Sequence, residues 1–185
     1  SDNDAYNRLY EFTTQDYINS HLRNKGIFTN SRIVHRVGVG GFSFDENRWA
    51  PSVNFLNKNG DSFHSRQPTF AQSSWLTPIS KTQKGKAYID TDGKKIEKPF
   101  DFSQKNFINI NDLQESLKRL IFPSLYPAGM QYNVENEDRA FVMESMAKLP
   151  KDHSYLKDKT DEYYDSYVKF FLFGDNKKAM PDHII

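Results

Sequence analysis

Residues 4–26 have the sequence DAYNRLYEFTTQDYINSHLRNKG, and this stretch predicts two short helices. In the first helix, apolar residues recur at spacings of four and three, which places them on one face: Ala5, Leu9 and Phe12. Thr14 is of the residue type that caps a helix start, and Gly26 suits a left-handed helix stop. The second helix has its own apolar stripe, formed by Tyr17, Ile18 and Leu22. This part of the chain is therefore predicted to be helical.

Three more helices are predicted after residue 108. The first is capped by Asn109 or Asn111, ends at Pro123 and turns inward a stripe of Leu113, Leu117, Leu120 and Ile121. The second runs from about Glu135 to Leu149, with Val142, Met143, Met146 and Leu149 facing inward. The third runs from about Thr160 to Gly174.

The middle of the chain has a different character. Residues 33–39 are rich in β-branched side chains, and residues 45–59 are interpreted as an ordered loop. Within residues 60–103, a hairpin is predicted around the turn at Asp92-Gly93. We therefore expect one domain over residues 1–185, mainly α with a small β-hairpin insertion, the β-rich part lying at about 60–103.

Composition excludes several classes of function. The net charge of +1 gives no overall field toward nucleic acid, and the sequence has no apolar run of the roughly 18 residues that span a bilayer. The absence of cysteine excludes disulfides, Cys-ligated zinc, iron–sulfur clusters and a cysteine nucleophile. The five histidines lack the spacing of a zinc site, so no metal and no cofactor are expected. The insertion's lysines are interpreted as a solvated face rather than an anion patch: Lys84, Lys86, Lys94, Lys95 and Lys98.

The run Ser1-Asp2-Asn3 resembles the Ser-Asp-Asn motif of class A β-lactamases and related penicillin-binding proteins. Small, Asn and Leu positions follow at the family's spacings, as Ala5, Asn7 and Leu9. The resemblance implies that Ser1 relays a proton to the leaving nitrogen and that Asn3 holds the substrate's acylamide chain. Asp2 would brace the loop, with Asn7 also supporting the site. The alternative is a helix N-cap run, for which Ser, Asp and Asn are the preferred residues.

The stretch Arg48-Trp-Ala-Pro-Ser-Val-Asn54 resembles the omega-loop signature of the same family, Arg-x-Glu-x-x-Leu-Asn. The resemblance implies that Arg48 supports the site and that Asn54 lies near the substrate. It departs from the family at Ala50, where the family's Glu activates the water that hydrolyses the acyl-enzyme. Deacylation is therefore expected to be slow or absent, unless a shifted loop lets Glu46 take that role.

Tyr163–Phe170 resembles a helix of serine hydrolases from Bacteroidetes. In the family, a helical lobe packs against an α/β lobe that supplies a Ser-x-x-Lys nucleophile and a Lys-Thr-Gly strand. We therefore expect this chain to be a fragment, the helical lobe of a longer parent protein, and we expect no catalysis by the chain alone. Ser145 and Lys148 have the Ser-x-x-Lys spacing, but they lie mid-helix and are interpreted as a chance match.

The function that follows is acyl transfer on D-Ala-D-Ala-like peptides or β-lactams, in the periplasm or at the cell surface. The expected partners are a small-molecule or peptidoglycan-peptide substrate and the remaining lobe of the parent. No nucleic acid and no transmembrane segment are expected. The alternative is a non-catalytic helical domain that binds a cell-surface glycan or protein through its aromatic residues, which make up 15 % of the sequence.

Overall fold

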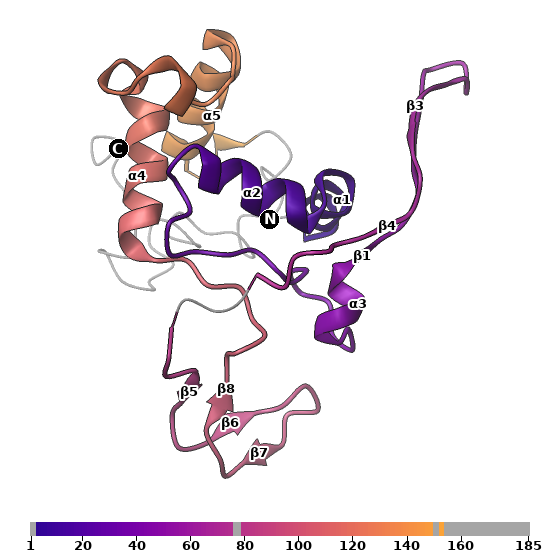
Figure 1. Cartoon of the computed structure of the whole chain (residues 1–185). Helices are drawn as coiled ribbons and strands as arrows, with labels where there is room; N and C mark the ends of the chain where they lie inside the picture. Colours follow the sequence, from indigo (N-terminus) through magenta and orange to yellow (C-terminus); the bar gives the residue numbers. More distant parts are fainter. Residues whose placement is uncertain (1–2, 76–78, 150–151, 154–185) are drawn as a thin grey trace. The chain divides into compact units, whose positions relative to one another are not determined.

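The chain divides into two compact units, Ser1–Gln131 and Tyr132–Ile185. The structure is a computed structural model that describes residues 3–75, 79–149 and 152–153 (Figure 1). Ser1, Asp2 and the helix predicted at residues 160–174 lie outside the described residues.

The first two predicted helices are confirmed as α1 (Asn3–Thr13) and α2 (Gln15–Asn24). Thr14 caps α2 by accepting a hydrogen bond from the backbone N–H of Tyr17, and Gly26 ends the segment with a φ of 68°. Their predicted apolar faces are wrong, because the residues that these helices bury are Asn7, Tyr10, Gln15 and Asn19. Leu9 and Tyr17 are each 56 % exposed.

The reason lies in the segment Ser31–Val37, which packs against these helices. It forms no strand; its one ladder contact is a bridge between Arg32 and Phe107. Most of its other bonded backbone groups are held by asparagine side chains from four places in the chain, namely Asn7, Asn19, Asn47 and Asn106. The carbonyl of Val34 accepts instead from the Gln15 carboxamide. Buried backbone N–H and C=O groups need partners, so the helices present carboxamides here rather than aliphatic side chains.

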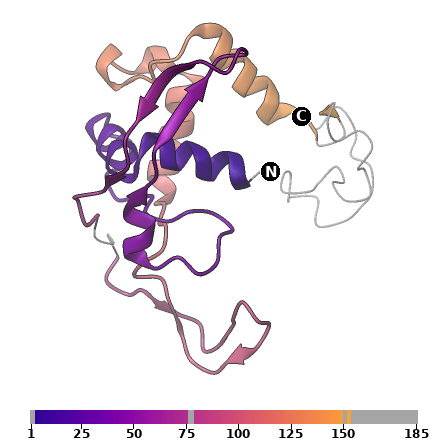
Figure 2. The same cartoon turned by 90° about the vertical axis from the view of Figure 1, so that its right-hand side faces the viewer.

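Residues 45–59 are not the predicted loop. They contain α3 (Phe44–Arg48), β1 (Trp49–Ala50) and β2 (Val53–Leu56). Helix α3 starts with a capping box, in which the Ser43 side chain accepts from the backbone of Glu46 and the Glu46 carboxylate accepts from the backbone of Ser43. Strand β1 pairs antiparallel with β4 (Thr69–Phe70), and β2 with β3 (Ser62–Arg66), which makes a long hairpin (Figures 1 and 2).

The predicted hairpin at Asp92-Gly93 is confirmed. Strand β6 (Tyr88–Ile89) pairs with β7 (Lys95–Ile96), and Gly93 has a φ of 78° that suits the turn. Strand β5 (Gln83–Lys84) pairs with β8 (Phe100–Asp101), on either side of this hairpin in the sequence. The rings of Tyr88 and Phe100 meet edge to face at 5.0 Å, which joins the two ladders.

Helix α4 (Ile110–Ile121) is capped by Asn109, one of the two residues predicted for this cap. Short 3-10 turns follow, η1 (Pro123–Leu125) and η2 (Ala128–Met130). The predicted inward stripe is again wrong, since Leu113 is 56 % exposed while Asp112 and Arg119 are buried. The Asp112 carboxylate accepts hydrogen bonds from Thr29, Asn30 and Ser31. These bonds attach α4 to the start of the segment Ser31–Val37, which is called the asparagine-held segment below.

In the second unit, α5 (Asn136–Ala147) confirms the predicted helix, and Leu149 after it is fully buried. The predicted inward stripe is otherwise wrong, because Val142 and Met146 are 39 % and 48 % exposed. Over the described residues, helices account for 39 % and strands for 16 %, with four separate two-stranded sheets. The expected fold class, mainly α with one small hairpin, is therefore wrong, and the chain is α+β. None of the described helices has the length and apolar character to cross a membrane.

Candidate functional site

The start of α1 lies against the end of the asparagine-held segment. Asn3 is the first residue of the helix, and its side chain covers Gly38, where a Cβ atom would come within 2.5 Å of Asn3 Nδ2. Gly38 also has a φ of 66°, which side chains disfavour. Only glycine therefore allows this approach. Ser1 and Asp2, the other two residues of the predicted motif, lie outside the described residues.

Asn7 lies one helical turn after Asn3 and holds the same segment. Its Nδ2 donates to the carbonyl of Val37 at 2.9 Å, and its Oδ1 accepts from the N–H of Val37 at 2.8 Å. The side chain is almost fully buried, so it is not free to contact a substrate. The structure thus brings Asn3 and Asn7 together on Val37 and Gly38.

Arg48 is placed at the neck of the long hairpin. Its Nε and Nη2 donate to the carbonyl of Ala71 at 3.1 and 2.6 Å, and its guanidinium lies 4.4 Å over the ring of Phe70. An exposed ion pair to Asp45 at 3.2 Å completes its contacts. Arg48 therefore attaches the end of α3 to Ala71, the residue that follows β4.

Asn54 lies in strand β2 opposite Ser65, and its side chain accepts a hydrogen bond from Ser62 in the same hairpin. This hairpin packs on the C-terminal end of α1: Phe55 meets Phe12 at 4.9 Å, and Arg66 donates to the carbonyl of Glu11. Asn3 and Phe12 are nine residues apart, about 14 Å along a helix. The structure therefore does not bring Asn54 together with Asn3 and Asn7.

Neither Ala50 nor Glu46, the two positions considered for a water-activating carboxylate, presents a free carboxylate. Ala50 is 4 % exposed and pairs with Thr69 in the β1–β4 ladder. Glu46 accepts from the backbone and side chain of Ser43, which holds the pKa of its carboxyl below the usual value. Glu46 is thus an ionised capping residue of α3.

A cavity of about 450 Å³ opens beside α1, and its walls are mostly apolar. Tyr6, Leu9 and Thr13 line it from the helix, and Ile33, Val37 and Ile108 from the opposite side. Asn7, His35, Arg36 and Asn106 contribute its polar groups. Such a cavity suits an apolar group with a few polar contacts at its edge.

Two residues here were missed by sequence reasoning. Arg36 is buried, pairs with Glu11 at 3.0 Å and donates to the carbonyl of Trp49. His35 bonds through one ring nitrogen to the carbonyl of Arg36 and through the other to the Lys105 ammonium. No local spacing signals these contacts, because their partners lie up to 70 residues away in sequence.

Tyr10, which also lines this cavity, is not an acid–base group at neutral pH. Burial raises the pKa of its hydroxyl to about 12, against the lowering effects of Gln15 and Arg36. The hydroxyl donates to the carbonyl of Asn47 at 2.8 Å. Among the described residues, no group of three or more His, Asp or Glu side chains lies close enough to hold a metal ion.

Comparison with known proteins gives no relative: no family model, no curated protein and no solved structure matches this chain.

Proposed function

We propose that this chain is an α+β part of a serine hydrolase that resembles class A β-lactamases and penicillin-binding proteins. The observation that carries the proposal is the position of Asn3, which is the first residue of α1 and lies on Gly38 one turn before Asn7. The motif's carboxamide is thereby held at a helix start, one turn before Tyr6 and Asn7, which line a cavity of about 450 Å³.

In this proposal the reaction is acyl transfer through a serine ester of the parent protein. Ser1 passes a proton to the leaving nitrogen, and the Asn3 carboxamide bonds to the acylamide chain of the substrate. The apolar cavity beside α1 receives the substrate's side chain. The substrates are D-Ala-D-Ala-like peptides or β-lactams, which places the parent in the periplasm or at the cell surface.

The acyl-enzyme of this parent deacylates slowly. Water attack needs a general base, and in class A β-lactamases this base is a glutamate carboxylate. The segment held by Asn7 and its neighbours, residues 33–38, contains no acidic residue. Ala50 has no ionisable group, and Glu46 is engaged in the α3 capping box. Asn54 does not contact the substrate in this proposal, because its hairpin packs on the C-terminal end of α1, away from Asn3.

The test is the labelling of the parent protein with fluorescent penicillin. We expect a labelled band that persists for many minutes, and Asn3→Ala should lower the labelling rate about tenfold because one substrate hydrogen bond is lost. Asn59→Ala, in the exposed turn of the β2–β3 hairpin, is the matched control and should label normally. Rapid turnover of a chromogenic cephalosporin by the parent would contradict slow deacylation.

A second candidate function is a non-catalytic binding domain. The β2–β3 hairpin favours it, because Leu56 and Phe63 are 56 % and 69 % exposed on a ribbon paired only with itself among the described residues. This candidate predicts no penicillin label on the parent. It also predicts sedimentation of the chain with insoluble peptidoglycan, which Phe63→Ser should abolish.

A further inference from the structure

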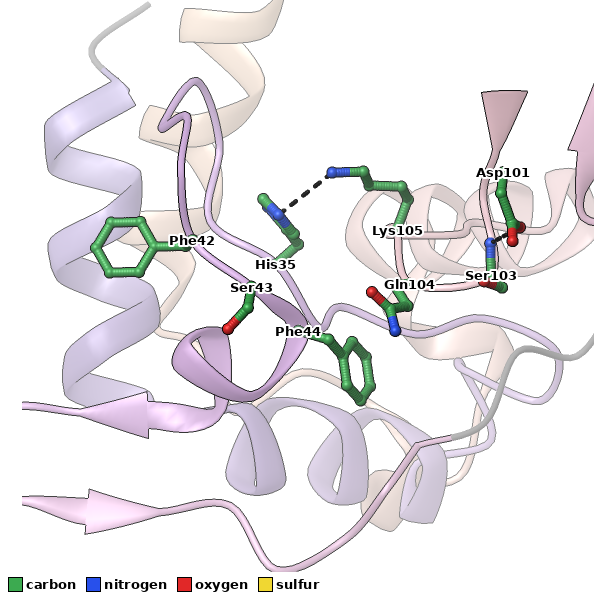
Figure 3. Close-up of a pocket in the computed structure, with 8 residues that line it drawn as sticks. All are labelled: His35, Phe42, Ser43, Phe44, Asp101, Ser103, Gln104 and Lys105. Carbon is green, nitrogen blue, oxygen red and sulfur yellow. Dashed lines mark hydrogen bonds between the residues drawn. The ribbon is translucent and has the colours of Figure 1, made fainter. Parts of the chain in front are cut away.

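We propose that a second cavity of the first unit binds a small molecule that carries both a carboxylate and an ammonium group. This cavity, of about 280 Å³, lies between His35 with the loop 42–44 on one side and the segment 101–105 on the other (Figure 3). Its size is at the lower end for ligand sites, which suits a molecule as small as an amino acid. The proposal goes beyond acyl transfer and does not depend on it.

His35 and Lys105 form the end of the cavity that receives the carboxylate, and their side chains point toward one another in Figure 3. The Nδ1 atom of His35 lies 2.6 Å from the carbonyl of Arg36, which assigns the proton to Nδ1. The Nε2 lone pair then accepts from Lys105 Nζ at 3.4 Å. Within the described residues, no carboxylate lies within ion-pair distance of that ammonium, so its charge is available to a ligand.

Both groups are held in place by neighbouring side chains. Asn106 bonds the backbone N–H and the carbonyl of His35, each at 2.9 Å. Arg32, which is 2 % exposed, donates to the carbonyls of Ser103 and Lys105 from beneath the segment. A site whose walls are fixed before the ligand arrives loses little entropy on binding. The bonds from Asn106 and Arg32 are the reason to treat the cavity as a preformed binding site rather than an irregularity of the surface.

The ammonium of the ligand is recognised by Asp101. This residue lies beyond Gln104 from the His35–Lys105 pair, next to Ser103 (Figure 3). Its Oδ1 accepts from the N–H of Ser103 at 2.8 Å, and this bond holds the pKa of its carboxyl below the usual value. A ligand with negative charge at both ends would be repelled by Asp101, whereas an ammonium would pair with it. Phe44 adds an apolar group to the lining, whereas the ring of Phe42 lies against the Arg36 guanidinium at 5.0 Å and points away from the other lining residues in Figure 3.

The test is a chemical-shift titration by NMR of the full 185-residue chain. The ligands are four amino acids in which the distance between the carboxylate and the ammonium group increases. The probes are glycine, β-alanine, 4-aminobutyrate and 6-aminohexanoate, compared with butyrate, butylamine and inorganic phosphate. We expect at least one amino acid to bind about tenfold more tightly than butyrate or butylamine, with shifts at His35 and Ser103. Lys105→Met should remove the contribution of the ligand's carboxylate to the affinity, so that the amino acids bind no more tightly than butylamine. Asp101→Asn should make the amino acid bind no more tightly than butyrate.

Lys98→Met and Asp92→Asn are the matched controls, because both residues are exposed on the same insertion and lie outside the cavity lining. They should leave every affinity unchanged. If Lys105→Met does not fold, the exposed Asp101→Asn variant still decides the question. The proposal is overturned if the amino acids bind no better than butyrate, if phosphate binds as tightly as the best of them, or if Asp101→Asn has no effect.

Discussion

At the scale of single residues, this protein relies on asparagine side chains where many proteins use a β-strand partner. A carboxamide has one donor side and one acceptor side, so it can satisfy both the N–H and the C=O of one residue. Asn7 does this for Val37, and Asn19 does it for Ile33. A residue that is unremarkable in a helix sequence therefore decides where a distant segment lies.

The cost of losing such a side chain is predicted to be large. In Asn19→Ala, the N–H and the C=O of Ile33 would both lose their partners in a buried environment, which should lower the free energy of unfolding by roughly 2–3 kcal/mol. Asn19→Asp should also destabilise the protein, because a carboxylate cannot donate to the carbonyl of Ile33. Urea unfolding followed by circular dichroism measures both. Asn59→Ala, at an exposed turn, should change stability by less than about 0.5 kcal/mol; equal losses at Asn19 and Asn59 would refute the role assigned to the carboxamide.

Asp112 gives a prediction on pH. Burial raises the pKa of its carboxyl, but the hydrogen bonds from Ser31, Thr29 and Asn30 outweigh burial and hold the pKa below the usual value. A folded-state pKa below the unfolded value means that stability is present above about pH 4 and is lost as the pH falls through the folded pKa. The urea midpoint should therefore drop between pH 5 and pH 2.5, and the gap between wild type and Asp112→Asn should narrow over that range. A gap that stays constant would exclude Asp112 as the titrating group.

At the scale of elements, the sequence predicted what local chemistry controls. The caps at Thr14 and Asn109 and the Asp92-Gly93 hairpin depend on residues within a few positions, and the structure has them. The buried helix faces could not be predicted, because they are set by Asn7, Asn19 and Asp112, whose bonding partners lie 14 to 83 residues away in sequence. Within the candidate site, Asn3 and Asn7 meet the same segment, but Asn54 lies in the β2–β3 hairpin. The Asn59-Gly60 turn of this hairpin was a signal in the sequence that the loop interpretation missed.

Arg32 fastens the insertion to the rest of the first unit. Its guanidinium donates to the carbonyls of Trp75, Ser103 and Lys105, which flank the β5–β8 region on both sides. In Arg32→Met, these carbonyls lose their shared donor, and we expect cleavage at Lys84 and Lys94 by a lysine-specific protease to become several-fold faster. Arg8→Met, with an exposed side chain, is the control and should be cleaved at the wild-type rate. Unchanged cleavage in Arg32→Met would show that other contacts hold the insertion.

At the scale of the whole molecule, the described residues have a core that is more polar than apolar. The fully or nearly buried set contains Asn7, Gln15, Asn19, Ser31, Arg32, Arg36, Asn47, Asp112 and Arg119, against seven apolar residues. Periodicity analysis assumes that apolar residues face inward, so it identified the helices and misassigned their faces. The same assumption hid the β content, because several strands have only two residues. The α+β class emerges only from pairing between separate parts of the chain.

The central claim is that Asn3 stands beside a serine ester in the parent protein, and it is tested most directly by intact-mass spectrometry of that protein after incubation with benzylpenicillin. We predict a covalent adduct with the mass of the intact β-lactam, formed more slowly in Asn3→Ala and still present after an hour. A parent protein whose mass stays unchanged at high penicillin concentration would contradict the claim.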